Sequence, residues 1–226
     1  MRFIFSVLAT ICLAAFSMPA AAAAAATPQS GVDYRTLVTP QHTDSGRKVE
    51  VLEFFGYFCP HCNSFEPFLE DWVKKQGNNI VFKRVPIAFN NDMIPQQRLY
   101  YAMEAMGKTE ELHKKVFAAI HVERKPLMKE DAIVDFIVKQ GIDRQKFLDA
   151  YNSFGVQTLA RRASQLQESY KIDGVPTVAI DGRYLTSPSI ANAGLPPNQP
   201  EGAMQAAALK VMDFLVAKAA AEKAKK

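Results

Sequence analysis

Two cysteines separated by two residues are the most reactive feature of this 226-residue sequence. Cys59 and Cys62 lie in the segment FGYFCPHCNSFEP, residues 55–67, behind an apolar run and ahead of a helical pattern. A pair at this spacing can bind a metal ion, close a structural disulfide, or exchange electrons with other thiols. The remainder of the sequence separates these three possibilities.

Metal binding and structural stapling are both poorly supported. A zinc site needs about four ligands, usually supplied as two pairs, and the histidines outside the motif, His42, His113 and His121, show no second-pair spacing. A disulfide that encloses so small a loop constrains the unfolded chain little and stabilises it weakly. We therefore expect neither a metal nor a separate cofactor.

Redox chemistry has a positive mechanism at this position. A thiolate attacks disulfides, and a helix that begins at or near Cys59 would place unpaired N–H groups and the positive end of its dipole beside this sulfur. Pro60 suits the first turn, where its missing N–H costs nothing. His61 can donate a hydrogen bond or carry charge, which favours the thiolate further. Cys62, one turn into the helix, lies nearer the interior and suits the role of the resolving cysteine.

The first 26 residues have the pattern of a secretory signal peptide. A positive residue, Arg2, precedes the apolar stretch 4–16 and an alanine run that ends at Ala26, so we expect cleavage near residues 24–26 and loss of Cys12. The mature chain would then keep only the CPHC pair, in an oxidising compartment. Its formal net charge of +4 before cleavage is a mild excess and does not indicate nucleic-acid binding.

The order of predicted elements is that of an α/β sheet with helices inserted in its middle. We expect a helix from Cys59 with a kink or break at Pro67, and a two-residue hairpin turn at Asp181-Gly182. The predicted domains are 1–26 signal peptide, 27–90 first part of the α/β domain, 91–170 inserted helical domain and 171–226 second part of the α/β domain. The expected strands are 33–38, 48–55, 80–87, 175–180 and 183–185, and the expected later helices lie near 96–106, 109 onward, 129–140, 143 onward, 156–166 and 201–220, the last after a proline-rich loop at 188–200.

The segments VLEFFGYFCPHCNSFEP and GVPTVAIDGRY, with the helical block between them, resemble thiol:disulfide oxidoreductases of the DsbA type. This resemblance covers essentially the whole mature chain. It implies a thioredoxin-like fold with an inserted helical domain, and a periplasmic enzyme that donates its disulfide to newly exported proteins. It also implies reoxidation by a quinone-linked inner-membrane partner of the DsbB type.

The resemblance assigns roles to particular residues. Cys59 would be the attacking cysteine, Cys62 the resolving one, and Pro60 and His61 the dipeptide that tunes them. Glu53 would be the acidic residue beneath the site that relays the proton of Cys62. The roles further from the motif fall on Val175 and Pro176, whose peptide bond would be cis and face the disulfide, and on Lys83 or Arg84 as the basic strand residue.

Several of these positions have a simpler interpretation. Glu53 could point to solvent from a half-exposed strand, and His113 and His121 are expected to be surface residues of a helix. Tyr57 and Phe58 could belong to the core or to an apolar rim that receives unfolded substrate.

Other functions also remain open. One is a disulfide isomerase or reductase, although only about 20 mature residues precede the first main strand, too few for a dimerisation domain, which favours a monomer. Another is a chaperone-like binding module in which the disulfide is incidental.

Overall fold

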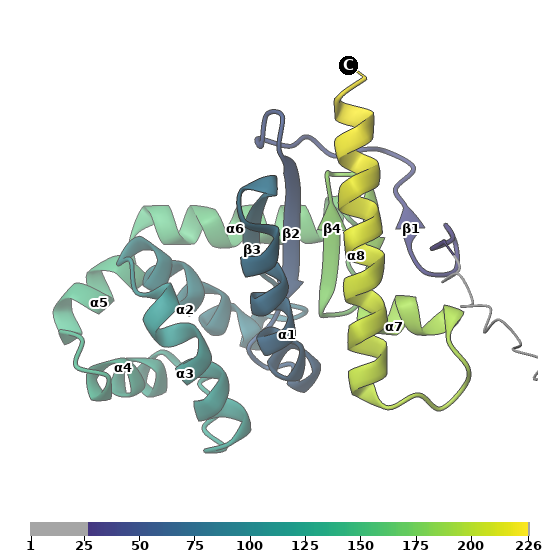
Figure 1. The fold of residues 1–226 in the computed structure, drawn as a ribbon. Coiled ribbons are helices and arrows are strands. Elements are labelled where there is room, and N and C mark those ends of the chain that lie inside the picture. The colour runs from purple at the N-terminus through teal and green to yellow at the C-terminus, as the bar shows by residue number, and fades with distance from the viewer. Residues whose placement is uncertain (1–26, 226) are drawn as a thin grey trace, which may run out of the picture.

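A five-stranded mixed sheet forms the centre of the computed structural model, which describes residues 27–225 (Figure 1). The strand order is β1-β5-β4-β2-β3, with β2 parallel to β3 and antiparallel to β4, while β5 is antiparallel to β4 and β1. The signal-peptide prediction falls on residues outside the described part of the chain. The strands are β1 Arg35–Thr36, β2 Val49–Phe55, β3 Ile80–Pro86, β4 Thr177–Ile180 and β5 Tyr184–Thr186.

Helices cover both faces of this sheet. Within residues 27–225 the α-helices are α1 Pro60–Gln76, α2 Ile94–Ala105, α3 Thr109–His121, α4 Glu130–Lys139, α5 Arg144–Tyr151, α6 Phe154–Ser169, α7 Pro188–Ala191 and α8 Glu201–Lys223. Figure 1 shows α1 and α8 in front of the sheet and α6 behind it, with α2 to α5 gathered to one side. None of the helices in this part of the chain is both long enough and apolar enough to cross a membrane.

The central strand β2 is buried on both faces, along all seven residues. Because side chains alternate between the faces of a strand, successive residues enter different cores. Val49 and Val51 pack in the cluster that includes α1 and α8, whereas Leu52 and Phe54 pack in the cluster that includes the helical block. Glu53 follows the same alternation as Val51, so this carboxylate lies on the face that α1 covers.

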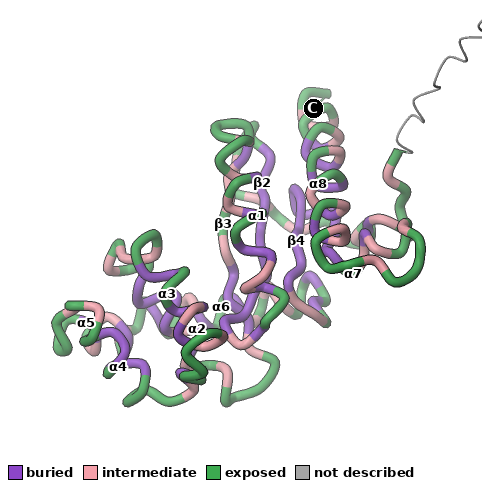
Figure 2. The backbone as a smooth tube through the Cα atoms, turned by 60° about the horizontal axis from the view of Figure 1, so that its bottom comes forward, coloured by how far each residue is buried: buried purple, intermediate pink, exposed green. Residues whose placement is uncertain are grey.

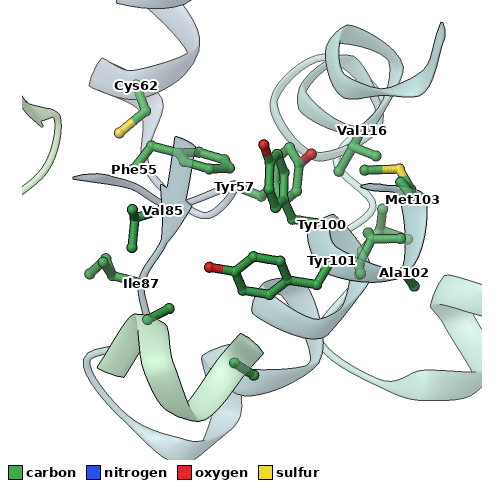
Figure 3. Packing of buried hydrophobic residues seen from close by; sticks show 14 of the residues in the cluster. Phe55, Tyr57, Cys62, Val85, Ile87, Tyr100, Tyr101, Ala102, Met103 and Val116 are labelled. Atoms are coloured by element: carbon green, nitrogen blue, oxygen red, sulfur yellow. The ribbon is translucent and has the colours of Figure 1, made fainter. Parts of the chain in front are cut away.

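The helical block between β3 and β4 is joined to the sheet by one continuous apolar cluster. Figure 3 shows Cys62 and Phe55 at one side of this cluster and Tyr100, Met103 and Val116 of α2 and α3 at the other. In Figure 2 the inner parts of α2 and α3 are buried, whereas the turns of α4 and α5 that lie farthest from the sheet are largely exposed. The predicted α/β fold with a helical insertion is confirmed.

Four local predictions need correction. The predicted break at Pro67 is wrong, because α1 continues through it and the fully buried side chains of Phe65 and Leu69 hold the helix against the sheet. The expected strand 33–38 is shorter than predicted and consists only of β1. The hairpin turn predicted to have two residues has three, since Ile180 pairs with Tyr184. The predicted loop 188–200 contains α7 and a short 3₁₀ turn.

Candidate active site

The dithiol lies where β2 ends and α1 begins. Cys59 is the N-cap of α1 and has an extended backbone, and Pro60 occupies the first turn as predicted. The Cys62 backbone N–H donates to Cys59 Sγ at 3.3 Å, so the sulfur takes the place of the oxygen that usually caps a helix. The geometry favours negative charge on Cys59.

The two sulfurs differ in environment. Both are free thiols, with side chains that are 6% exposed for Cys59 and 0% for Cys62. The hydrogen bond from the Cys62 thiol, together with the backbone N–H groups and the charge of His61, lowers the pKa of Cys59 to about 7 despite its burial. Burial raises the pKa of Cys62 well above its usual value. Cys59 is therefore the nucleophile and the more accessible of the two sulfurs, although it is itself buried.

His61 points away from the core and binds the last helix. Its Nδ1 lies 2.8 Å from Glu201 Oε1, at the first turn of α8. This hydrogen bond is the main reason that the pKa of His61 is raised. Ser64 Oγ donates to the same carboxylate oxygen at 2.6 Å. The dipeptide between the cysteines is thus tied to a residue 140 positions away.

A chain of buried charges lies beneath the dithiol. Glu53 is 1% exposed, which excludes the solvent-facing alternative, and its Oε2 accepts a hydrogen bond from Arg84 Nε at 3.1 Å. Arg84 also donates to Glu66 Oε1 at 2.5 Å. Burial and the neighbouring charge of Glu66 raise the pKa of Glu53 to about 8, although Arg84 opposes this shift. Glu53 can therefore exchange a proton near neutral pH.

Both basic strand residues that the sequence left open face an acidic residue of β2. Arg84 is paired with Glu53 in the strand register, and Lys83 Nζ bonds to Glu50 Oε2 at 2.7 Å. Strand alternation puts these two ion pairs on opposite faces. Arg84 is the one on the α1 face, below the dithiol.

The prediction that His113 is a surface residue is wrong. This α3 side chain is 4% exposed, its Nδ1 lies 2.7 Å from Tyr57 Oη, and its Nε2 lies 3.4 Å from Glu66 Oε2. Burial lowers the pKa of His113, with partial compensation from Glu66. His121 is partly buried and its Nε2 lies 2.8 Å from the Tyr57 carbonyl oxygen, so it also anchors the segment before the cysteines. Both side chains face inward because α3 packs its apolar face against Phe55 and Tyr57.

The aromatic residues before Cys59 divide between core and rim. Tyr57 is 1% exposed and belongs to the core. Phe58 is only partly buried and packs edge-on against Phe89, which is 44% exposed, with the ring centres 6.1 Å apart. The apolar rim therefore consists of Phe58 and Phe89.

The loop before β4 completes the site. The Val175–Pro176 peptide bond is cis, and the Val175 carbonyl oxygen accepts a hydrogen bond from Cys59 Sγ at 3.2 Å. A hollow of about 390 Å³ opens beside this loop and reaches His61. Its apolar lining comes from Val175, Pro176, Pro188, Ile190 and Met204, and its polar lining includes Arg35, Asp173 and Glu201.

Within residues 27–225, no group of three or more His, Cys, Asp or Glu side chains is arranged to hold a metal ion.

Sequence reasoning missed Glu66, His113 and Glu201 as neighbours of the site. The spacing could have predicted Glu66, because it lies four residues after Cys62 and so on the same side of the helix. No sequence pattern predicts His113 or Glu201, since each reaches the site only through the packing of a distant helix.

Comparisons with known proteins agree with this geometry. Residues 50–205 match the family described as DSBA-like thioredoxin domain. The chain is 48% identical to the thiol:disulfide interchange protein DsbA of Burkholderia cepacia over 174 residues, 76% of this chain and 82% of that protein. It is 46% identical to the protein of the same name from Bordetella parapertussis over 209 residues, 92% of this chain and 93% of that one. The crystal structure of Pseudomonas aeruginosa DsbA superposes with a TM-score of 0.79 at 33% identity, covering 88% of this chain and 97% of that chain.

Proposed function

Because the chain belongs to the DSBA-like thioredoxin domain family and is a thiol:disulfide oxidoreductase, we propose that it acts as an oxidant that passes the Cys59–Cys62 disulfide to cysteine pairs of newly exported proteins. The observation that carries this proposal is the difference between the two sulfurs. The sulfur of Cys59 is stabilised as a thiolate and the sulfur of Cys62 is not. A stabilised thiolate favours the reduced enzyme, and an enzyme that favours its reduced form is an oxidant.

The exchange proceeds in two balanced steps. A substrate thiolate attacks Cys59 Sγ of the oxidised enzyme, forming a substrate–Cys59 disulfide while the Cys59–Cys62 bond breaks and its electron pair goes to Cys62. A second substrate thiolate then attacks the substrate sulfur of this mixed disulfide and releases Cys59 as a thiolate. The substrate loses two electrons and gains a disulfide, and the enzyme gains the two electrons as a dithiol.

We assign to Glu53 the proton that Cys62 needs when it leaves. A buried sulfur with a strongly raised pKa is a poor leaving group unless it is protonated. Glu53 lies on the strand face beneath α1, and its pKa of about 8 leaves it mostly protonated at pH 7. Arg84 holds the carboxylate in place in either protonation state.

The substrate segment would lie along the Val175–Pro176 loop. The Val175 carbonyl already accepts a hydrogen bond from Cys59, so a bound chain at this edge is brought next to the reactive sulfur. The adjacent hollow offers Ile190 and Met204 to apolar side chains, which unfolded proteins expose and folded proteins bury. Phe58 and Phe89 extend this apolar surface on the other side of the dithiol.

Oxidative refolding of ribonuclease tests the direction of the reaction. Oxidised enzyme mixed with reduced, denatured ribonuclease in the absence of oxygen should transfer about one disulfide per molecule and become a dithiol that iodoacetamide can label. Cys59→Ser provides the matched control and should transfer none. An enzyme that remains oxidised in this mixture would contradict the proposal.

Two further assays address the alternatives. Scrambled ribonuclease incubated without an added oxidant should recover little activity if the protein is an oxidant and much activity if it is an isomerase. Alkylation of Cys59 should abolish oxidation, whereas a chaperone-like module with an incidental disulfide would still suppress aggregation of an unfolded protein.

We also propose that the chain is exported to the periplasm after removal of residues 1–26, works as a monomer and is reoxidised by a quinone-linked membrane protein of the DsbB type. The sequence pattern of residues 1–26 and the family membership support this placement. No cofactor beyond the Cys59–Cys62 disulfide is proposed. The mass of the protein from a periplasmic extract would show whether the chain begins near residue 27.

A further inference from the structure

Glu201 occupies an unusual position for an exposed acidic residue. Its carboxylate lies at the start of α8, yet it contacts α1 inside the CPHC motif through His61 and three residues further on through Ser64. Both contacts use the same atom, Oε1, at 2.8 and 2.6 Å. The start of the 23-residue helix α8 is thereby joined to the start of α1.

The Ser64 hydroxyl that binds the Glu201 carboxylate is itself held by a buried side chain. Ser64 Oγ, which donates to Glu201, accepts a hydrogen bond from Gln205 Nε2 at 3.1 Å, and the Gln205 side chain is buried. Exposed ion pairs usually contribute little because two flexible side chains must be ordered. Here Ser64 holds the carboxylate and Gln205 holds Ser64, so only the imidazole remains to be ordered.

The surroundings of His61 contain few other charges. Cys59 faces it from the start of α1 and Glu201 faces it from α8. Across the hollow, Arg35 and Asp173 lie 3.8 Å apart and compensate each other's charge. The charge state of His61 therefore depends mainly on Glu201 and on the thiolate of Cys59.

We propose that Glu201 is a positioning residue of the redox site: by binding His61 and Ser64 it fixes the imidazole beside Cys59 and keeps its positive charge available to the thiolate. The carboxylate hydrogen bonds to His61 and to Ser64 but to neither sulfur. Its effect on the dithiol should therefore pass through His61. Removing the charge of Glu201 while keeping its shape should leave His61 neutral more of the time and make the enzyme a weaker oxidant.

The variant Glu201→Gln tests this directly. Loss of one anchored surface charge should lower the pKa of His61 by about 0.5, measured by NMR, and should lower the equilibrium constant for reduction by glutathione by less than about twofold near pH 7. With a pKa of about 7, ionisation of Cys59 contributes at most about twofold to this constant at that pH. Near pH 5 the imidazole is protonated in both proteins and Cys59 is mostly a thiol, so the two equilibrium constants should coincide. Glu201→Asp keeps the charge and should give intermediate values.

Glu168→Gln is the matched control. Glu168 is exposed on α6, on the other side of the sheet from α1 and α8 (Figure 1), and the change removes the same charge. It should alter neither the titration of His61 nor the equilibrium with glutathione.

A double-mutant cycle with His61→Ser decides whether Glu201 acts through the imidazole. In the His61→Ser background, Glu201→Gln should no longer weaken the oxidant, because no imidazolium remains to be held. An equal decrease in both backgrounds, or no decrease in the parent enzyme, would overturn the proposal.

Since the proposal for Glu201 rests on the proposed oxidant function, the parent enzyme must first oxidise ribonuclease. If it does not, the function is wrong. If it does and the cycle shows no coupling, only the role of Glu201 is wrong.

Discussion

Reduction of the Cys59–Cys62 disulfide should stabilise the folded protein by an amount that grows from about pH 6 to about pH 8. The pKa of Cys59 is about 7 in the folded protein, against about 8.5 for an ordinary cysteine in an unfolded chain. A group whose pKa is lower in the folded state contributes stability that is full above the unfolded value and is lost as the pH falls through the folded value. The oxidised protein has no thiolate and lacks this contribution.

The magnitude follows from the two pKa values. The free energy of unfolding gained by the reduced form is close to zero at pH 6, about 0.4 kcal/mol at pH 7 and about 1.3 kcal/mol at pH 8, with a limit of about 2 kcal/mol. The raised pKa of Cys62 acts in the opposite sense, but mainly above about pH 8.5, where the unfolded chain would ionise that thiol. The useful window therefore lies between about pH 6 and about pH 8.

Urea unfolding of both redox forms, followed by circular dichroism, measures this difference. Subtracting the oxidised curve removes groups that titrate alike in both forms. Reduced Cys59→Ser, which keeps Cys62 but has no titrating nucleophile, should show no such increase. If the difference between the redox forms of the parent protein is flat across the window, the thiolate of Cys59 is not stabilised by the fold. An oxidised form that is the more stable one at pH 8 would also refute the reasoning.

Three further predictions concern single side chains around the dithiol. Cys62→Ser should accumulate mixed disulfides with substrate proteins on a non-reducing gel, because the Cys59 thiolate can still attack a substrate disulfide and no Cys62 thiol remains to displace the substrate. Cys59→Ser should give none, and equal trapping by both variants would contradict the assignment. His61→Ser should raise the pKa of Cys59 and weaken the oxidant, and the absorbance of the thiolate near 240 nm, measured against pH, would show the change in pKa. An unchanged titration would mean that the helix terminus alone lowers the pKa of Cys59. Glu53→Gln should increase the free energy of unfolding by about 1 to 3 kcal/mol near pH 7 and by little near pH 4, because a buried carboxyl with a raised pKa destabilises the fold only above its unfolded value. The same variant should slow the release of Cys62, and equal stability at both pH values would contradict the burial argument.

The residues next to the two cysteines in the sequence were sufficient to predict their chemistry. The strand 48–55, Gly56 and Pro60 within a few residues of one another predict where α1 begins, and a helix start is enough to favour a thiolate at Cys59. The strong apolar pattern of residues 48–55 likewise predicted the strand itself. These features depend on neighbours in the chain, so the residue order alone determines them.

The orientation of Glu53 illustrates what the sequence left open. A glutamate inside an apolar strand is compatible with a half-exposed edge or with a buried centre, and the pattern of one strand does not distinguish them. Pairing with β3 and β4 on both sides, and helices on both faces, bury it completely. Only then do Arg84 and Glu66 become its partners and raise or lower its pKa.

His113 and Glu201 were decided by the tertiary structure entirely. A histidine in an amphipathic helix is expected at a polar surface position, but α3 packs so that His113 meets Tyr57 and Glu66 in the interior. Glu201 reaches His61 because α1 and α8 lie side by side on one face of the sheet. Chain connectivity does not specify such contacts; they arise when separate elements bury their apolar faces against a common sheet. The reactive cysteine pair could therefore be predicted from the sequence, whereas the charged residues that surround it are brought there by the packing of helices distant in the chain.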